Sequence, residues 1–200
     1  MVVEKSDPNS LPLIANHLKG GDLVIMPCDT IYGIVGVVDL SLAKLNQLKG
    51  RGGEKHFIQL VTLEMANSIA RCPIDEAILS LWPAPLTVIV ADIWGGTTAI
   101  RVPADAFLIA LLELVGKPLY TTSVNLTGEP FLNAFDQIYG AFKAKVSLFV
   151  RGEIGENSLP STILDTSGDK YKIIRQGSLD LSDIIIHNIE ALSKCEIGLS

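Results

Sequence analysis

Two cationic side chains two residues apart are the first feature of this sequence that could do chemistry. Lys49 and Arg51 stand among three glycines, at positions 50, 52 and 53. In extended backbone, positions i and i+2 point to the same side, so both cations could meet one anion. Arginine binds phosphate in a bidentate fork, lysine adds a point charge, and glycine lets the backbone approach a ligand. A solvated basic turn is the alternative, and this spacing alone does not exclude it.

A hydroxyl and a carboxamide repeat the same spacing at Ser123 and Asn125. They directly follow an apolar run, residues 118–122, that is typical of a strand, and ligand sites in α/β sheets tend to lie at strand ends. These two groups can contact a base, a ribose or a phosphate without adding charge. The alternative is a turn in which both side chains bind their own backbone.

Several common sites are absent from the sequence. Neither the G-x-x-x-x-G-K-[ST] loop of many NTPases nor the G-x-G-x-x-G dinucleotide motif occurs. The three cysteines and three histidines are scattered without metal-ligand spacing, so we expect no protein-bound metal site. Cys28 is a weak candidate nucleophile, because no histidine occupies an evident partner motif.

Composition narrows the class of protein further. The chain has 200 residues, of which 48% are hydrophobic, and 16 basic against 22 acidic residues give a net charge of −6. This balance disfavours nonspecific nucleic-acid binding, which depends on Lys and Arg. No apolar run reaches the ~20 residues of a membrane span, and the first residues do not resemble a signal peptide. We expect a cytoplasmic protein without a membrane partner.

The elements that must position these residues alternate between apolar runs and amphipathic segments, the pattern of an α/β domain. Strands are predicted at residues 23–26, 33–38, 57–61, 86–90, 99–102, 118–122, 148–150, 162–164 and 171–174. Helices are predicted at residues 11–18, 42–48, 74–82, 105–115, 136–142 and 180–194. The order does not follow a regular βαβ rhythm, so we expect residues 1–200 to form one domain with a mixed twisted sheet and flanking helices.

Seven motifs in order resemble those of YrdC/TsaC-type threonylcarbamoyl-AMP synthases, over nearly the whole span from Gly21 to Gly177. They are Pro27-x-Asp29-Thr30-x-Tyr32-Gly33, Lys49-x-Arg51, Trp82-Pro83-x-Pro85-Leu86-Thr87, Arg101-Val102-Pro103, Ser123-x-Asn125-x-x-Gly128-Glu129-Pro130, Ser161-Thr162 and Arg175-x-Gly177.

This resemblance implies an activity and a set of site residues. The family condenses L-threonine, bicarbonate and ATP, used with Mg²⁺, into threonylcarbamoyl-AMP and pyrophosphate. This is the first step toward threonylcarbamoyladenosine in tRNA, and downstream tRNA-modifying proteins use the product. Lys49 and Arg51 would be the catalytic cations in a concave, positively charged cleft. The implied ATP contacts are Lys49, Arg51, Thr121, Ser123, Asn125, Ser161 and Arg175, and the implied threonine contacts are Thr30, Tyr32 and Arg101.

The sequence also departs from the family pattern and leaves alternatives open. Cys28 stands where the family usually has threonine, and Lys55-His56 follow the glycines where a Lys-Pro pair is usual. A repurposed YrdC-like paralogue that binds RNA or protein is one alternative. A carbamoyl-transfer protein of the HypF type is another, although the zinc-finger and acylphosphatase segments of that type are absent from this sequence. Direct tRNA binding and the general base stay open.

Overall fold

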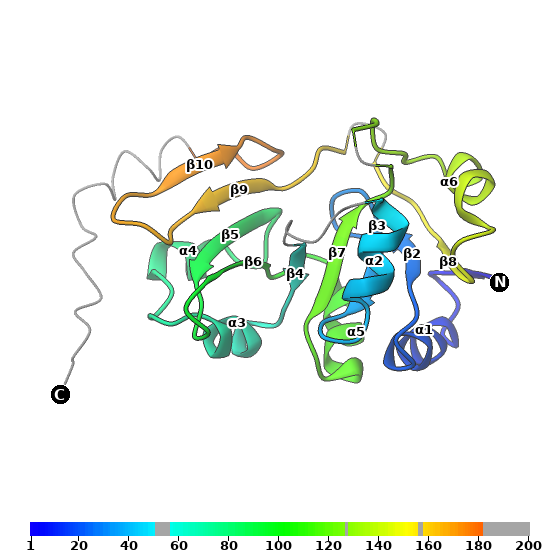
Figure 1. Ribbon diagram of the computed structural model, residues 1–200, viewed down its shortest axis with the longest axis horizontal. Coiled ribbons are helices and arrows are strands. Elements are labelled where there is room, and N and C mark those ends of the chain that lie inside the picture. The colour runs from blue at the N-terminus through cyan, green and yellow to red at the C-terminus, as the bar shows by residue number, and fades with distance from the viewer. Residues whose placement is uncertain (51–56, 127, 156–157, 182–200) are drawn as a thin grey trace.

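One mixed sheet runs through the molecule. The computed structural model describes residues 1–50, 57–126, 128–155 and 158–181. Within these residues ten strands form a sheet in the order β1-β8-β2-β3-β7-β4-β6-β5-β9-β10 (Figure 1). The strands are β1 (Val2–Glu4), β2 (Val24–Pro27), β3 (Tyr32–Val37), β4 (Ile58–Leu60), β5 (Leu86–Ala91), β6 (Thr97–Arg101), β7 (Leu119–Ser123), β8 (Leu148–Arg151), β9 (Thr162–Asp165) and β10 (Lys172–Arg175). The helices are α1 (Ser10–Lys19), α2 (Leu42–Lys49), α3 (Leu63–Ile69), α4 (Glu76–Leu81), α5 (Ala106–Val115) and α6 (Phe135–Phe142).

Parallel and antiparallel pairs occur side by side, which confirms the predicted mixed sheet. β2, β3, β7 and β4 pair antiparallel in turn, whereas β8 runs parallel to both β1 and β2. β4 also pairs parallel with β6, and β5 pairs parallel with β9. All nine predicted strands are present, and β1 was missed. The helix predicted at residues 180–194 lies, from residue 182 onward, outside the described residues.

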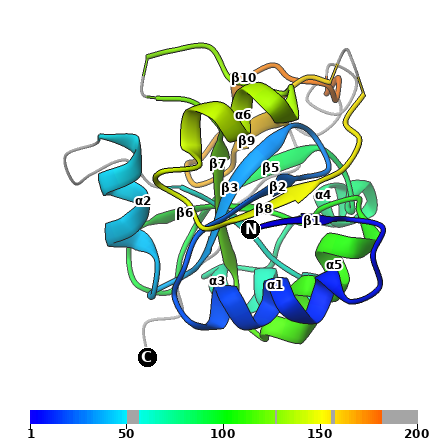
Figure 2. The same ribbon diagram turned by 90° about the vertical axis from the view of Figure 1, so that its right-hand side faces the viewer.

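The part of the sheet around β2 and β3 is covered on both faces. Val24 and Met26 pack against α1 and α5, whereas Ile25 between them packs in the cluster that contains α2 and α6. This follows from the two-residue side-chain period of a strand and explains why β2 is apolar at every position. Figure 2 shows α1 and α5 on one side of these strands and α6 on the other.

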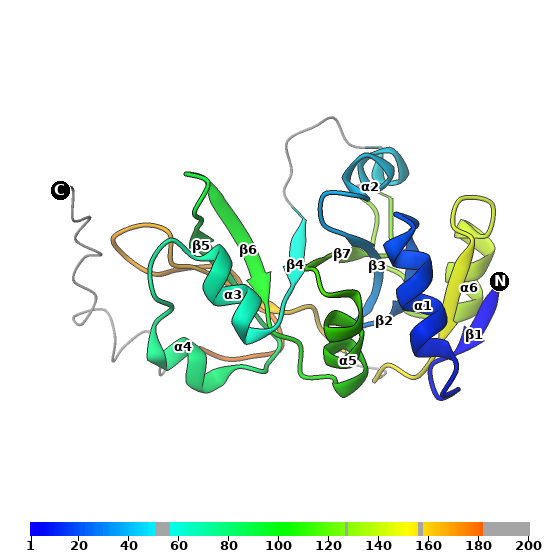
Figure 3. The same cartoon turned by 90° about the horizontal axis from the view of Figure 1, so that it is seen from below.

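A separate core lies under the other part of the sheet. There α3 and α4 pack against β5 and β6, through residues that include Ile69, Ile78, Val88 and Ile100. In Figure 3 this group and the group of α1, α5, β2 and β3 lie on opposite sides of the short strand β4. The β4–β7 pairing connects the two parts through three residue pairs. The junction between two cores is therefore a place where side chains from distant segments can face each other.

Local end signals place the helices that flank this junction. The Asp105 carboxylate caps α5 by accepting hydrogen bonds from the backbone N–H groups of Phe107 and Leu108, at 2.9 and 3.1 Å. Gly116 ends that helix in a left-handed conformation, and Gly50 ends α2 in the same way, with φ of 73° and 62°. Gly50 thus fixes the end of α2 directly after Lys49.

Candidate functional site

A cavity of about 320 Å³ lies at this junction. Its wall comes from the β2–β3 turn, the start of β4, the ends of β6, β7 and β10, and the start of β9. Seven predicted site residues line it: Thr30, Tyr32, Arg101, Thr121, Ser123, Ser161 and Arg175. Cys28 and Phe131 also line it, although the motifs did not predict them as contacts, and the large Phe131 side chain is 38% exposed. The fold therefore gathers residues from positions 28 to 175 around one space.

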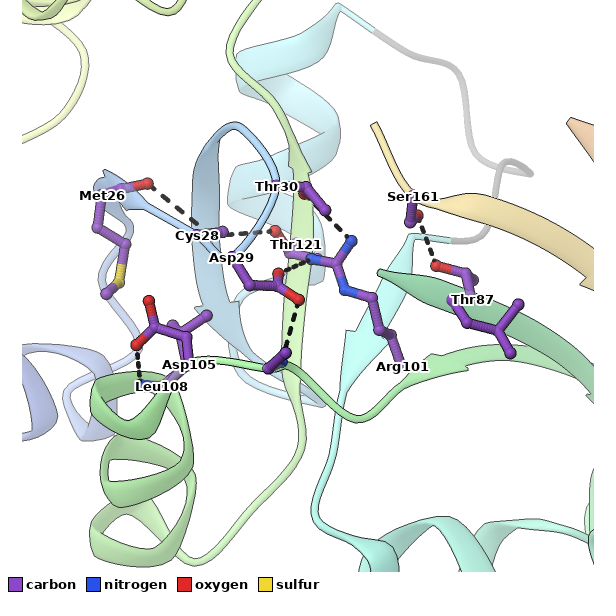
Figure 4. A network of polar contacts seen from close by, with 12 residues as sticks. Met26, Cys28, Asp29, Thr30, Thr87, Arg101, Asp105, Leu108, Thr121 and Ser161 are labelled. Atoms are coloured by element: carbon purple, nitrogen blue, oxygen red, sulfur yellow. Dashed lines mark hydrogen bonds and ion pairs between the residues drawn. The ribbon is translucent and has the colours of Figure 1, made fainter. Parts of the chain in front are cut away.

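The Arg101 guanidinium is held in place by the β2–β3 turn. Its Nη2 lies 2.9 Å from Asp29 Oδ1, as a close ion pair rather than an aligned hydrogen bond, and both side chains are at most 4% exposed. Its Nη1 donates to Thr30 Oγ1 at 3.3 Å. Asp29 is itself anchored, since Oδ2 accepts from the backbone N–H of Ala104 at 3.3 Å. Figure 4 shows Asp29 and Thr30 on one side of the guanidinium, and Ser161 and Thr87 on the other.

Arg101 keeps hydrogen-bonding capacity for a ligand. Its Nε is buried and has no hydrogen-bond partner among the described residues. Leaving a buried charged donor without an acceptor is costly, so an acceptor supplied by a ligand would be stabilising. A carboxylate or phosphate oxygen has the required chemistry.

A second guanidinium faces the cavity from β10. Arg175 donates to the backbone oxygen of Ser161 from Nε and Nη2, at 3.2 and 2.8 Å. The Ser161 hydroxyl in turn lies 2.8 Å from Thr87 Oγ1, a contact seen in Figure 4. Burial lowers the pKa of Arg175, and the nearby charge of Arg101 lowers it further. Two like charges around one space favour an anion between them.

The wall between β3 and β7 is small and uncharged. A methyl group on Gly33 would come within 2.8 Å of both Cys28 Sγ and Thr121 Oγ1, so a larger residue would force these side chains to move. Burial raises the pKa of the Cys28 thiol to about 11. A neutral, buried thiol is a poor nucleophile, which argues against the nucleophile role considered for Cys28.

Tyr32 lines the cavity, but its hydroxyl is already bound. Tyr32 Oη donates to the Gly152 backbone oxygen at 2.8 Å and accepts from the Gly152 backbone N–H at 3.1 Å. Burial raises the pKa of this phenol. Tyr32 therefore fixes the segment after β8 to the start of β3, and what it offers the cavity is its ring.

Lys49 is not the solvated turn residue that its sequence context allowed. It is 1% exposed, and its Nζ donates to Ser123 O at 2.9 Å, Asn125 O at 2.6 Å and Asn125 Oδ1 at 2.5 Å. Neither Lys49 nor Asn125 is among the residues that line the cavity. The expected convergence of Lys49 with Arg51 on an anion falls partly outside the described residues, because Arg51 lies there.

Among the described residues, no group of three or more His, Cys, Asp or Glu side chains could hold a metal ion. Asp29, the carboxylate beside the cavity, is paired with Arg101. Protein-bound Mg²⁺ often has only one or two carboxylate ligands and takes its other oxygens from substrate phosphates and water. Within the same residues, no helix has the length and apolarity of a membrane span.

Fold and cavity together define an α/β protein with a mixed twisted sheet and an anion-attracting cavity between its two cores. The chain belongs to the Sua5/YciO/YrdC family, whose model, described as "Telomere recombination", matches residues 16–177. This agrees with the resemblance found in the motifs.

Individual relatives support the same assignment. A Pyrococcus abyssi protein named threonylcarbamoyl-AMP synthase is 26% identical over 92% of this chain, which spans 58% of that relative's length. A Mycobacterium tuberculosis protein named as a candidate threonylcarbamoyl-AMP synthase is 30% identical over 84% of this chain and 83% of its own. The crystal structure of P. abyssi Sua5 with L-threonine superposes with a TM-score of 0.83 at 23% identity, over 92% of this chain and 59% of that one. The structural match shows that the fold is shared.

Proposed function

We propose that this chain condenses L-threonine, bicarbonate and ATP into threonylcarbamoyl-AMP and pyrophosphate. The observation that carries the proposal is the pair Arg101 and Arg175, which face one cavity together with the hydroxyl-bearing residues Thr30, Thr121 and Ser161. Two fixed cations suit the two anionic substrates, a triphosphate and an amino-acid carboxylate. The names of the relatives and the threonine bound to P. abyssi Sua5 support the same reaction.

The proposed chemistry has two steps. The threonine amine forms an N–C bond with CO2 derived from bicarbonate and loses a proton, which gives a carbamate. A carbamate oxygen then bonds to the α-phosphorus of ATP, and the bond from that phosphorus to the pyrophosphate oxygen breaks. Little covalent work falls to the protein, so positioning and charge neutralisation supply the catalysis.

Each side of the cavity takes one substrate in this proposal. Arg101 and Thr30 bind the threonine carboxylate, beside the ring of Tyr32. Arg175, Ser161 and Thr121 bind the nucleotide, and Mg²⁺ enters with ATP. The product would pass to tRNA-modifying proteins, in a cytoplasmic setting. An arginine contact to a charged oxygen contributes roughly 1.5–3 kcal/mol, about ten- to a hundredfold in affinity.

Pyrophosphate release tests the proposal. Purified protein with Mg-ATP should release pyrophosphate only when L-threonine and bicarbonate are both present, and Arg101→Met should lower kcat/KM by at least about tenfold. Lys44→Met is a suitable control, because Lys44 lies on the exposed side of α2 and pairs with Asp22. Pyrophosphate release without threonine would refute the synthase. Nucleotide binding without any release would favour the repurposed paralogue instead.

A further inference from the structure

The hydroxyl of Ser123, at the end of β7, has a fixed direction. Its Oγ lies 2.8 Å from Asn125 Oδ1. The Asn125 amide cannot be flipped, because Oδ1 accepts from the Lys49 ammonium at 2.5 Å and Nδ2 donates to the Glu129 backbone oxygen at 2.6 Å. An ammonium only donates and a carbonyl only accepts, so both contacts assign the same orientation. The Ser123–Asn125 contact therefore uses the hydroxyl proton of Ser123.

This direction decides what Ser123 can recognise. A serine hydroxyl has one proton and two acceptor lone pairs. With its proton directed at Asn125, Ser123 presents only lone pairs to the cavity that it lines. An ionised phosphate oxygen is also only an acceptor, so it cannot form a hydrogen bond with Ser123 in this state. The matching ligand group must be a donor.

Lys49 holds the Ser123–Asn125 turn in place through hydrogen bonds. Its ammonium binds the backbone oxygens of both Ser123 and Asn125 as well as Asn125 Oδ1, and so connects the end of α2 to the end of β7. Hydrogen bonds from a charged donor are about twice as strong as neutral ones. The side chain is buried, and it reaches residues 74 and 76 positions away in sequence. Lys49 thus orients the Ser123–Asn125 turn instead of facing the cavity.

We propose that Lys49 and Asn125 are positioning residues that keep Ser123 as a hydrogen-bond acceptor for a donor group of the nucleotide. The proposal rests on the proposed function and refines its nucleotide side. ATP carries such donors in two places, the ribose hydroxyls and the exocyclic amine of adenine. Both share the chemistry that Ser123 requires, and binding measurements can separate them.

Nucleotide analogues test the ligand group. Affinity is measured by calorimetry without threonine or bicarbonate, for ATP, 2′-deoxy-ATP, 3′-deoxy-ATP and purine riboside triphosphate, which lacks the amine. Ser123→Ala should weaken ATP binding about three- to tenfold, the value of one neutral hydrogen bond. The same substitution should have no effect with the one analogue that lacks the donor in question, which identifies it. An equal loss with all four nucleotides would overturn the proposal.

The number of phosphates tests the role of Lys49. If Lys49 is a positioning residue, Lys49→Met should lower the affinities for ATP, ADP and AMP by the same factor, because all three nucleotides make the contact with Ser123. If Lys49 instead contacts a phosphate, the loss of affinity in Lys49→Met should become smaller from ATP to ADP to AMP. That result would refute the positioning role. Lys44→Met, on the exposed side of the same helix, should leave all three affinities unchanged.

A second variant keeps the test decisive if Lys49→Met folds poorly. Asn125→Ala leaves the lone pairs of Ser123 but frees its proton, so the hydroxyl is no longer held as an acceptor and can also donate. The ratio of the affinity for ATP to the affinity for the donor-lacking analogue should therefore fall toward its value in Ser123→Ala. Unchanged discrimination would overturn the proposal. Failure of the proposed function looks different, since wild-type protein would then bind none of these nucleotides or release no pyrophosphate.

Discussion

The buried ion pair between Asp29 and Arg101 makes a quantitative prediction for Asp29→Asn. The change keeps the shape of the side chain but removes its charge, and leaves the guanidinium uncompensated at 4% exposure. Breaking a buried pair in this way costs roughly 3–5 kcal/mol. We expect the lower end, about 3 kcal/mol, because Thr30 still accepts from Arg101. For a domain of this size the melting temperature should fall by roughly 6–12 °C.

Urea unfolding and thermal melting measure this loss. The matched control is Asp22→Asn, which breaks a pair with Lys44 whose side chains are 49% and 51% exposed. Exposed pairs contribute under about 1 kcal/mol, so this control should be nearly neutral.

The double variant Asp29→Asn/Arg101→Met tests whether the unpaired guanidinium charge causes the loss of stability. If the penalty comes from an unpaired buried charge, removing the charge should recover part of the stability lost in Asp29→Asn. A loss in Asp29→Asn no greater than in Asp22→Asn, or a double variant less stable than Asp29→Asn, would refute this reasoning.

Two further predictions concern the cavity wall. Burial raises the pKa of Cys28 to about 11 from 9.0, so its alkylation at pH 8 should be about a hundredfold slower in the folded protein than in urea. Peptide mass spectrometry measures both rates, and equal rates would contradict the burial of Cys28. Gly177→Ala should destabilise the protein by about 1–3 kcal/mol, because the added carbon would overlap backbone atoms of residues 160–162. It should also weaken ATP binding, because this overlap lies beside the Ser161 oxygen that holds Arg175. Gly140→Ala in α6 has open space and should not destabilise; if both variants melt alike, the steric argument is wrong.

Local signals in the sequence predicted those parts of the fold that are decided locally. The helix predicted at residues 105–115 matches α5, whose end signals, the cap residue Asp105 and the left-handed Gly116, each act within one helical turn. The missed helix α3 also had such a signal, since the Thr62 side chain accepts from the backbone N–H of Met65 and Glu64 lies in the first turn. Strand β1 had none, because its three residues become a strand only by pairing with β8.

In the site, too, local sequence signals differ from contacts that only the tertiary structure decides. The motifs predicted which residues gather at the cavity, but they could not predict which of them face it. The spacing predicted that Lys49 meets an anion, with a solvated turn as the alternative, whereas its ammonium binds Ser123 and Asn125, far along the chain. The pairing of Asp29 with Arg101 is likewise a tertiary contact, between the β2–β3 turn and the end of β6.

The place of β1 in the sheet has a consequence for the protein during its synthesis. Val2 pairs with Phe149, so β1 cannot form this pairing until β8 leaves the ribosome. At 5–20 residues per second that interval is roughly 7–30 s. Arg175 is synthesised later still, because it lies on β10, which pairs antiparallel with β9. A nascent chain therefore carries Thr30 and Arg101 long before it carries the second guanidinium, and a ligand that contacts both arginines can stabilise the fold only after translation has passed β10.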